Sequence, residues 1–451
     1  MRLRLTDIAS WVGGRLLGSG VFVESVSTDS RSLTPGALFV ALKGERYDAH
    51  DFIETARERG ASAALVEREL AIDMPQIVVA DTLAALGDLA RAVRSQRTAR
   101  VIGITGSNGK TTVKTLTASI LARHGRTHVN AGNFNNEIGL PLTLIAMPPD
   151  TEYAVLEMGA GKPGDIAYLA RIARPDVGLV NNVAAAHLER LGSERGVAET
   201  KGAIYSALPA NGVAIVNADD AYADYFAGLA TPRRIVRYGL TARADVTAQT
   251  DTNGRITLRT PSGEARVTLV QPGRHNVMNA LAAASIAIAL DVPLATIQAG
   301  LEAAPAVAGR LMRRAHASGA VLIDDSYNAN PGSFAAAIAT LAAEAGTTIL
   351  VMGDMAELGA DAERLHAETG ALAKRSGIQR LHAVGRLSRA AAEAFGAGAT
   401  HHVDQPALID ALRGELRNGV TVLIKGSRSS AMDRVVSALL ENGNGGERHA
   451  A

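Results

Sequence analysis

The sequence predicts a three-domain α/β protein, in which two doubly wound units follow a small N-terminal α/β domain. Three observations predict this fold. The chain has 451 residues, more than one hydrophobic core normally organises, so two or three domains are expected. Short apolar runs of strand length alternate with helical segments, which is typical of parallel sheets. A glycine loop, "TGSNGKTT", stands between a predicted strand and a predicted helix.

The first 97 residues are predicted to form the small N-terminal α/β domain. They mix short apolar runs such as "GALFVAL" with turn signals and lead into the charged, helical "LGDLARAVRSQRTAR". The start of the chain, "MRLRLTDIASWVGG", has no uninterrupted apolar stretch of the length that a signal peptide needs.

Residues 98–308 are predicted to form a central domain around a parallel sheet. The runs "VIGI", "YAVLEM", "VGLVNNV" and "VAIVN" indicate strands, and "VKTLTASILARHG" indicates a helix directly after the glycine loop. Between residues 234 and 270, alternating β-branched segments predict an antiparallel appendage. The apolar run "ALAAASIAIAL" is shorter than the ~20 residues of a bilayer span, so it predicts a buried helix.

Residues 309–451 are predicted to form a Rossmann-like, doubly wound domain. Four apolar runs, "AVLIDDS", "TTILVMGD", "RLHAVG" and "GVTVLIKGS", indicate strands between helices. The final "NGNGGERHAA" is polar and rich in glycine, so we expect it to be frayed.

The composition excludes several classes of function. Apolar residues make up 47% and charged residues 20% of the chain, which is ordinary for a soluble globular protein. A net charge of +1 gives no global field that would recruit nucleic acid or an acidic membrane. The absence of cysteine excludes disulfides, thiolate metal sites and cysteine nucleophiles, and is consistent with a reducing compartment. We therefore expect a cytoplasmic protein. No feature of the sequence encodes the oligomeric state, and a monomer is the default expectation.

The glycine loop predicts a nucleotide site. Its glycines let backbone N–H groups point at a phosphate chain, Lys110 supplies a positive charge, and Thr111 offers a hydroxyl to a Mg²⁺ ion. The strict P-loop spacing would require glycine where Ile104 stands, so the match is to the shorter G-x-x-G-K-T-T. Its position between strand and helix favours nucleotide binding over a glycine turn with an exposed lysine.

Two further side chains follow predicted strands of the same sheet. Glu157 ends "YAVLEM" and His187 follows "VGLVNNVAAA", so both are expected at the edge where parallel sheets place their active sites. A carboxylate and a neutral imidazole suit Mg²⁺ or Mn²⁺. Each also has an ordinary alternative, because a glutamate at a strand end is often solvated and a single histidine often fills a polar niche.

Lys201 lies on a helical stripe that is predicted to be buried. It shares this stripe with Val197, Ile204, Tyr205 and Leu208. A buried ammonium is costly unless it is paired or neutralised. Three interpretations remain open: the side chain extends outward to solvent, it meets a ligand, or CO₂ has converted its amine to a carbamate near the metal.

Nine stretches together resemble the bacterial Mur ligases in order and spacing, over nearly the whole chain. They are "TGSNGKTT", "AGNFNNEIGLP", "AVLEMGA", "NNVAAAHLERLGS…GVAETKGAIYSAL", "GRHNVMNALAA", "AGRLM", "DDSYNANP", "GDMAELG" and "KGSRS". The resemblance implies an ATP-dependent ligase with a central P-loop ATPase domain. Within the family, the chain looks most like the ligases that join D-alanyl-D-alanine to a UDP-N-acetylmuramoyl-tripeptide. The D-N-P-R signature of sister ligases that add the third residue does not occur in the sequence.

The resemblance also implies residues for ATP and Mg²⁺. The ATP phosphates would contact Gly106, Ser107, Asn108, Gly109, Lys110, Thr111 and Thr112, with Lys110 on the γ-phosphate. Mg²⁺ would be bound by Thr111, Glu157 and His187, beside a carbamylated Lys201. Asn276 would contact adenine, Arg310 the γ-phosphate and Asp325 the nucleotide. The alternatives for these three are a helix N-cap, a solvated linker arginine and a helix-initiating turn.

For the other substrates the resemblance implies a second group of residues. "TDSRSLTPGALFVALKGERYDAHDFI" resembles the UDP-sugar segment, with the matching positions Asp29, Ser30, Arg31, Asp48 and His50. An asparagine of "GNFNNEIG", taken as Asn136, belongs to the metal centre, although Asn133, Asn135 and Asn136 are all equally typical of turns. Asn328 and Asn330 are candidates for the dipeptide pocket, with loop hydrogen bonding as the alternative.

The implied reaction transfers the γ-phosphoryl group of ATP to the tripeptide carboxylate, and the dipeptide amine then attacks the acyl phosphate. A closing third domain is expected to exclude water from the acyl phosphate. Two alternatives remain open: a sister ligase of the same architecture, such as one acting on folate and glutamate, and a nucleotide switch that only hydrolyses ATP. The sequence does not distinguish lysine from diaminopimelate as the third residue of the tripeptide.

Overall fold

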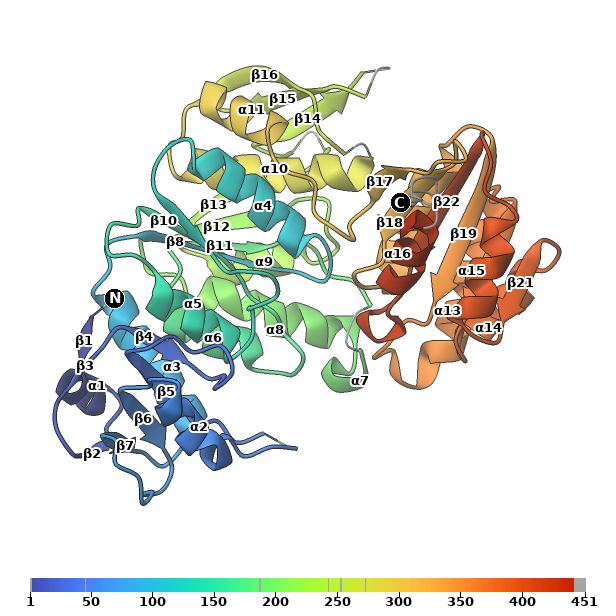
Figure 1. The fold of residues 1–451 in the computed structure, drawn as a ribbon. Coiled ribbons are helices and arrows are strands. Elements are labelled where there is room, and N and C mark those ends of the chain that lie inside the picture. Colours follow the sequence, from blue (N-terminus) through green and yellow to red (C-terminus); the bar gives the residue numbers. More distant parts are fainter. Residues whose placement is uncertain are drawn as a thin grey trace, which may run out of the picture.

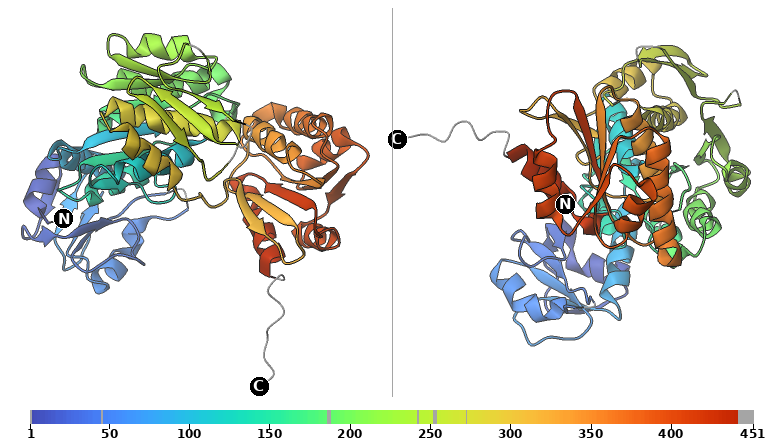
Figure 2. Two further views of the ribbon diagram at one scale, coloured as in Figure 1. Left: turned by 90° about the horizontal axis from the view of Figure 1, so that it is seen from above. Right: turned by 90° about the vertical axis from the view of Figure 1, so that its right-hand side faces the viewer.

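The computed structural model describes residues 2–44, 46–185, 188–241, 243–251, 254–271 and 273–441. They form three α/β units. The N-terminal unit packs below the central unit and the C-terminal unit lies beside the central one (Figure 1), an arrangement that two further views also show (Figure 2). The predicted α/β class with three domains is confirmed.

The N-terminal unit is built on a five-stranded sheet in which only the edge strand β2 is antiparallel. Its strands, in sheet order, are β2 (Arg15–Leu17), β7 (Gln76–Val78), β6 (Ala63–Val66), β5 (Ala37–Val40) and β4 (Ser25–Ser27). The other elements are β1 (Leu3–Arg4), β3 (Phe22–Val23), α1 (Leu5–Trp11), η1 (Ala49–Phe52), α2 (Ile53–Glu58) and α3 (Thr82–Ser95). Helix α3 packs against two helices of the central unit, so one hydrophobic core runs through both units.

The central unit is a parallel sheet of six strands, with β8 in its interior. The sheet order is β13 (Arg234–Tyr238), β12 (Val213–Asn217), β11 (Val177–Val180), β8 (Arg100–Thr105), β10 (Tyr153–Glu157) and β9 (Thr127–Val129). Its helices are α4 (Lys110–Leu121), α5 (Gly139–Ala146), α6 (Asp165–Ala173), α7 (Leu188–Leu191), α8 (Glu194–Ser206), α9 (Ala223–Ala230), α10 (Arg274–Ala289) and α11 (Leu294–Glu302). Strands buried on both faces explain the continuous apolar runs in the sequence.

The predicted antiparallel appendage is confirmed but begins later than expected. It consists of β14 (Thr247–Thr250), β15 (Ile256–Thr260) and β16 (Gly263–Val267). Strand β13 instead pairs in parallel with β12, so it belongs to the main sheet. The predicted buried helix is α10, whose alanine-rich face contacts α4 and the sheet. Within the described ranges no helix is long and apolar enough to cross a membrane.

The C-terminal unit is a second doubly wound sheet, as predicted, with an antiparallel strand at one edge. The sheet order is β17 (Met312–Ala315), β18 (Val321–Asp325), β22 (Val420–Lys425), β19 (Thr347–Gly353), β20 (Arg380–Val384) and β21 (Ala399–His402). Separate cores lie on its two faces. Its helices are α12 (Pro331–Ala342), η2 (Gly359–Asp361), α13 (Ala362–Arg375), α14 (Ser388–Phe395), α15 (Gln405–Arg413), η3 (Arg428–Ser430) and α16 (Asp433–Glu441). The tail that we expected to be frayed, residues 442–451, lies outside the described residues.

Candidate active site

The phosphate loop connects the central strand β8 to helix α4. Gly109 precedes the helix with φ 79°, a left-handed conformation in which a Cβ would overlap Asn279, so only glycine fits. Lys110 is the first residue of α4, and its Nζ donates back to Gly106 O at 2.8 Å. The ammonium therefore lies over the loop, and burial lowers the pKa of Lys110. This geometry is that of an anion site at a helix N-terminus.

Asparagines that the sequence analysis did not single out hold the loop in place. Asn182 Oδ1 accepts from Asn108 N at 2.9 Å, and its carbonyl accepts from Ser107 N at 2.9 Å. Asn181 Nδ2 donates to Asn108 O at 2.9 Å and to Asn279 Oδ1 at 3.1 Å. The only signal in the sequence is "NN" directly after strand β11, at the carboxyl end of the sheet. These bonds fix the shape of the loop.

Glu157 lies beside the loop and is buried, so the interpretation as a solvated strand end is wrong. Its Oε2 accepts from Thr111 Oγ1 at 2.9 Å and its Oε1 accepts from Asn135 Nδ2 at 2.7 Å. A carboxylate and a hydroxyl oxygen at this separation fit neighbouring positions around Mg²⁺, which prefers oxygen ligands in octahedral geometry at about 2.0–2.1 Å. Among the described residues there is no group of three or more His, Cys, Asp or Glu that could hold a metal ion. The predicted ligand His187 lies outside the described residues.

The structure brings Asn135, and not Asn136, against Glu157. Asn136 Oδ1 accepts from Gly139 N at 2.9 Å and from Ile138 N at 3.3 Å, which is the turn interpretation. Motif spacing does not distinguish adjacent asparagines. This explains why the sequence pointed to Asn136 whereas the structure places Asn135 against Glu157.

Lys201 is buried on the inner face of α8, so the interpretation that it extends to solvent is wrong. Burial, with the positive charge of Lys110 added to it, lowers the pKa of Lys201 to about 7. A sizeable fraction of the amine is therefore neutral near pH 7, and the neutral amine is the form that reacts with CO₂.

A cleft of about 780 Å³ lies between the central and C-terminal units. Asn276 contributes to it from the first turn of α10; the N-cap of this helix is Gly273, so the N-cap interpretation is wrong. Asp325 ends β18 and accepts from Lys425 Nζ at 2.6 Å and from Leu311 N at 3.2 Å. The alternative role for Asp325 was to initiate the following helix. Asn330 is instead the N-cap of that helix, α12.

A second cleft of about 650 Å³ meets the first at the phosphate loop and at Arg310, which line both. It contains Lys110 and Glu157 from the central unit and Asn328 from the C-terminal unit. The Arg310 guanidinium lies 4.4 Å from the centre of the Tyr327 ring, so it is held against an aromatic face and is not a freely solvated linker arginine.

Asn328 and Asn330, the candidates for the dipeptide pocket, make the loop hydrogen bonds that were the alternative expectation for them. Asn328 Oδ1 accepts from Ala329 N at 2.9 Å, and its carbonyl accepts from Lys425 Nζ at 2.9 Å. Asn330 Oδ1 accepts from Ser333 N at 2.8 Å. Asn328 and Asn330 both line the second cleft.

The five residues expected on the UDP-sugar side lie in the N-terminal unit and line neither cleft. Asp29 forms an exposed bidentate pair with Arg31, whose side-chain hydrogen bonds lower the pKa of Asp29 to about 2. His50 is buried between Asp48 and the backbone N–H of Glu67, which donates to its Nε2 at 2.9 Å. The backbone hydrogen bond from His50 is the main cause that lowers the pKa of Asp48 to about 2. Ser30 is buried.

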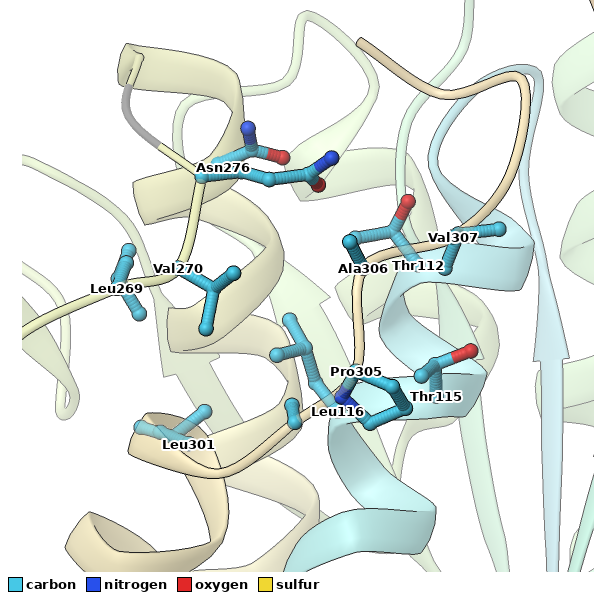
Figure 3. A pocket seen from close by; sticks show the side chains of 12 residues that line it. Thr112, Thr115, Leu116, Leu269, Val270, Asn276, Leu301, Pro305, Ala306 and Val307 are labelled. Carbon is cyan, nitrogen blue, oxygen red and sulfur yellow. The ribbon is translucent and has the colours of Figure 1, made fainter. Parts of the chain in front are cut away.

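A small hollow of about 30 Å³ lies beside the first cleft, between α4, the start of α10, the end of α11 and the linker that follows (Figure 3). Thr112, Asn276 and Val307 are among the residues that line it. The hollow adjoins the larger cleft, with which it shares Thr112, Gln271 and Asn276. Asn276 thus borders both the hollow and the larger cleft.

Comparison with known proteins gives matches along most of the chain. Residues 23–94 match the Mur ligase family, catalytic domain, residues 104–287 the Mur ligase middle domain, and residues 309–428 the Mur ligase, glutamate ligase domain. The UDP-N-acetylmuramoyl-tripeptide–D-alanyl-D-alanine ligase of Escherichia coli K12 is 48% identical, over 98% of each chain.

The chain is also similar to solved structures of ligases from two other bacteria. A crystal structure of MurF from Acinetobacter baumannii superimposes with a TM-score of 0.93 at 34% identity, covering 98% of this chain and 99% of the other. MurF ligase from Thermotoga maritima, in complex with ADP, gives a TM-score of 0.84 at 28% identity, with 93% and 97% of the two chains covered.

Proposed function

The chain belongs to the Mur ligase family, and on that premise we propose which of its residues perform the family's reaction. It is an ATP-dependent ligase that joins D-alanyl-D-alanine to a UDP-N-acetylmuramoyl-tripeptide in the synthesis of peptidoglycan precursors. One observation supports the assignment of residues most directly: the two clefts meet at the phosphate loop and Arg310, between the units that carry Lys110 and Asp325.

In our proposal the ATP triphosphate lies on residues 106–112, with its base in the larger cleft near Asn276 and its ribose near Asp325. Mg²⁺, held by Thr111 and Glu157 with His187 as a further ligand, would neutralise phosphate charge when bound. Lys110 and Arg310 approach the γ-phosphoryl group from different units, so domain closure would bring both positive charges to the transferring group.

The first step transfers the γ-phosphoryl group to the terminal carboxylate of the tripeptide. The bond between the β,γ-bridging oxygen and the γ-phosphorus breaks, ADP leaves, and an acyl phosphate forms. In the second step the neutral amine of D-alanyl-D-alanine attacks the carbonyl carbon. The tetrahedral intermediate expels phosphate, and the nitrogen loses its extra proton to give the amide.

Other parts of the assignment rest on the sequence and stay predictions. They are the domain limits at residues 97/98 and 308/309, the carbamate on Lys201, and the UDP-sugar contacts of Asp29, Ser30, Arg31, Asp48 and His50. Four more predictions are a dipeptide contact of Asn328 or Asn330, a contribution of Asn136, a cytoplasmic location and a monomeric state.

Release of phosphate from ATP tests the proposal. We expect release to require both the UDP-muramoyl-tripeptide and D-alanyl-D-alanine, and Lys110→Ala to lower the rate by about 100-fold or more. Lys374→Ala, at an exposed lysine of the C-terminal unit, is the control. Release without any acceptor would indicate a nucleotide switch, and release with folate and glutamate a sister ligase. Full coupling by Lys110→Ala would refute the assigned phosphate site.

A further inference from the structure

We propose that Lys114 is a positioning residue that holds the Glu157 carboxylate, together with the loop of residues 130–136, in the arrangement needed to bind a divalent cation. The proposal rests on the proposed function, because it assumes that Glu157 is a metal ligand. Lys114 lies one helical turn after Lys110 on α4, so the two side chains leave similar faces of the helix. The side chain of Lys114 is only 7% exposed, so this lysine is a buried part of the site.

The Lys114 ammonium makes two hydrogen bonds and one ion pair. Its Nζ donates to Asn130 O at 3.0 Å and to Gly132 O at 3.1 Å, and it lies 3.6 Å from Glu157 Oε2. A lysine has three N–H donors, and burying its charge is costly unless they are matched. The contacts thus link the chain segment after β9 to the carboxylate at the end of β10.

Asn130 extends this link to the backbone of Glu157. Strand β9 pairs with β10 only as far as Val129, which lies opposite Val155. One residue later, the Asn130 side chain replaces the strand: its Oδ1 accepts from Glu157 N at 3.0 Å and its Nδ2 donates to Glu157 O at 3.2 Å. Lys114 donates to the Asn130 carbonyl, so it also holds Asn130 in the position from which this residue binds the Glu157 backbone.

The far end of the loop returns to the same carboxylate. Asn135 Nδ2 donates to Glu157 Oε1 at 2.7 Å, and its carbonyl accepts from Gly159 N at 2.8 Å. Glu157 is thus held at its backbone by Asn130, at Oε1 by Asn135 and at Oε2 by Thr111 and Lys114. Without Lys114, two backbone carbonyls lose their lysine donor, and the loop keeps only the indirect link to α4 through Glu157 and Thr111.

Two effects of Lys114 on a bound cation oppose each other, which makes the proposal testable. Its positive charge, close to Glu157, repels a cation, so removal of the charge alone would strengthen metal binding. Loss of positioning would weaken it, and groups that orient metal ligands typically change metal affinity by about 10–100-fold. Our proposal requires that the loss of positioning dominates.

The test compares Lys114→Met, which removes the charge and the donors, with Lys114→Gln, which removes the charge and keeps N–H donors. Isothermal titration calorimetry gives the Kd of ADP in EDTA and at increasing Mg²⁺. For Lys114→Met we expect the Kd of ADP in EDTA to be unchanged. In the unaltered protein we expect Mg²⁺ to strengthen ADP binding, and the variant should need about a 10-fold higher Mg²⁺ concentration for half of that effect. Amide hydrogen exchange should quicken in residues 130–136. Lys114→Gln should show a smaller rise.

Lys374→Met is the matched control, because this exposed lysine lines neither cleft and its contacts are with Ala397 O and the Phe395 ring. A lower Mg²⁺ requirement in Lys114→Met would assign only a charge effect to the lysine and overturn the proposal. An unchanged requirement with reduced thermal stability would show a merely structural role and overturn it too. If Lys114→Met does not fold, Lys114→Gln decides by the same criteria. ADP binding that ignores Mg²⁺ in the unaltered protein would instead refute the proposed metal site.

Discussion

Asn330 of the C-terminal unit donates from Nδ2 to Oδ1 of Asn108 in the phosphate loop at 2.8 Å, a direct hydrogen bond between the two units. The same amide caps helix α12, because its Oδ1 accepts from Ser333 N at 2.8 Å. One side chain thus joins the start of a helix in the C-terminal unit to the loop expected to hold the triphosphate. A nucleotide bound on this loop would therefore be physically linked, through Asn330, to the relative position of the units.

Variants of Asn330 separate the two roles. Asn330→Ser keeps a capping oxygen but is too short to reach Asn108, whereas Asn330→Ala loses both contacts. We expect Ser to leave thermal stability nearly unchanged and to weaken ADP binding by about 2–10-fold, as for one neutral hydrogen bond. Ala should in addition cost about 1 kcal/mol of stability. Equal ADP affinity for the Ser variant and the unaltered chain would show that the bond between the units has no role in nucleotide binding.

Replacement of Lys201 should change how protein stability depends on pH, because its charge is buried. Its pKa in the folded chain, about 7, lies below the ordinary 10.5, so between these values the unfolded state binds more protons and stability rises with pH. Lys201→Met removes this titration. We expect the variant to gain stability relative to the unaltered chain at pH 7, and the gain to shrink towards pH 10, as measured by urea unfolding.

The same variant tests the carbamate. We expect Lys201→Met to lose most ligase activity although it folds, since it lacks an amine for CO₂. The unaltered enzyme should lose activity in CO₂-depleted buffer and recover with bicarbonate. If activity does not respond to bicarbonate, Lys201 is not carbamylated in the active enzyme.

Much of this architecture could be predicted because it depends on local pattern. Strands buried on both faces read as continuous apolar runs. The helical stripe through Lys201 predicted a buried face of α8, which is confirmed, but it left open whether the lysine side chain itself extends to solvent. The contact between Asn181 and Asn279 could not be predicted, because it joins residues 98 positions apart that carry no periodic signal. The choice of Asn135 over Asn136 depends on how a loop folds back to Glu157, which neighbouring identical residues do not encode.

Arg310 offers a test of transition-state stabilisation across the clefts. We expect Arg310→Ala to lower kcat by about 10²–10³-fold with a smaller change in KM for ATP, because our proposal places its charge at the transferring phosphoryl group. Arg310→Lys should recover only part of the rate, since lysine lacks the planar group that lies on Tyr327. Steady-state kinetics provide the measurement, with the exposed Arg314→Ala as control. A change confined to KM would assign Arg310 to ground-state binding.

The buried pair of Lys425 and Asp325 should separate stability from nucleotide binding. Their charged atoms lie 2.6 Å apart, with side chains 1% and 8% exposed. Lys425→Met leaves the Asp325 carboxylate buried without its cation, so we expect a loss of about 3–5 kcal/mol in the free energy of unfolding. The double replacement Lys425→Met with Asp325→Leu should recover most of that stability, because a buried pair contributes little over an apolar one. It should still bind ADP poorly, since Asp325 is the residue proposed to contact the ribose. Denaturant unfolding and calorimetry measure the two quantities on the same samples, and normal ADP affinity in the stable double variant would remove Asp325 from the nucleotide site.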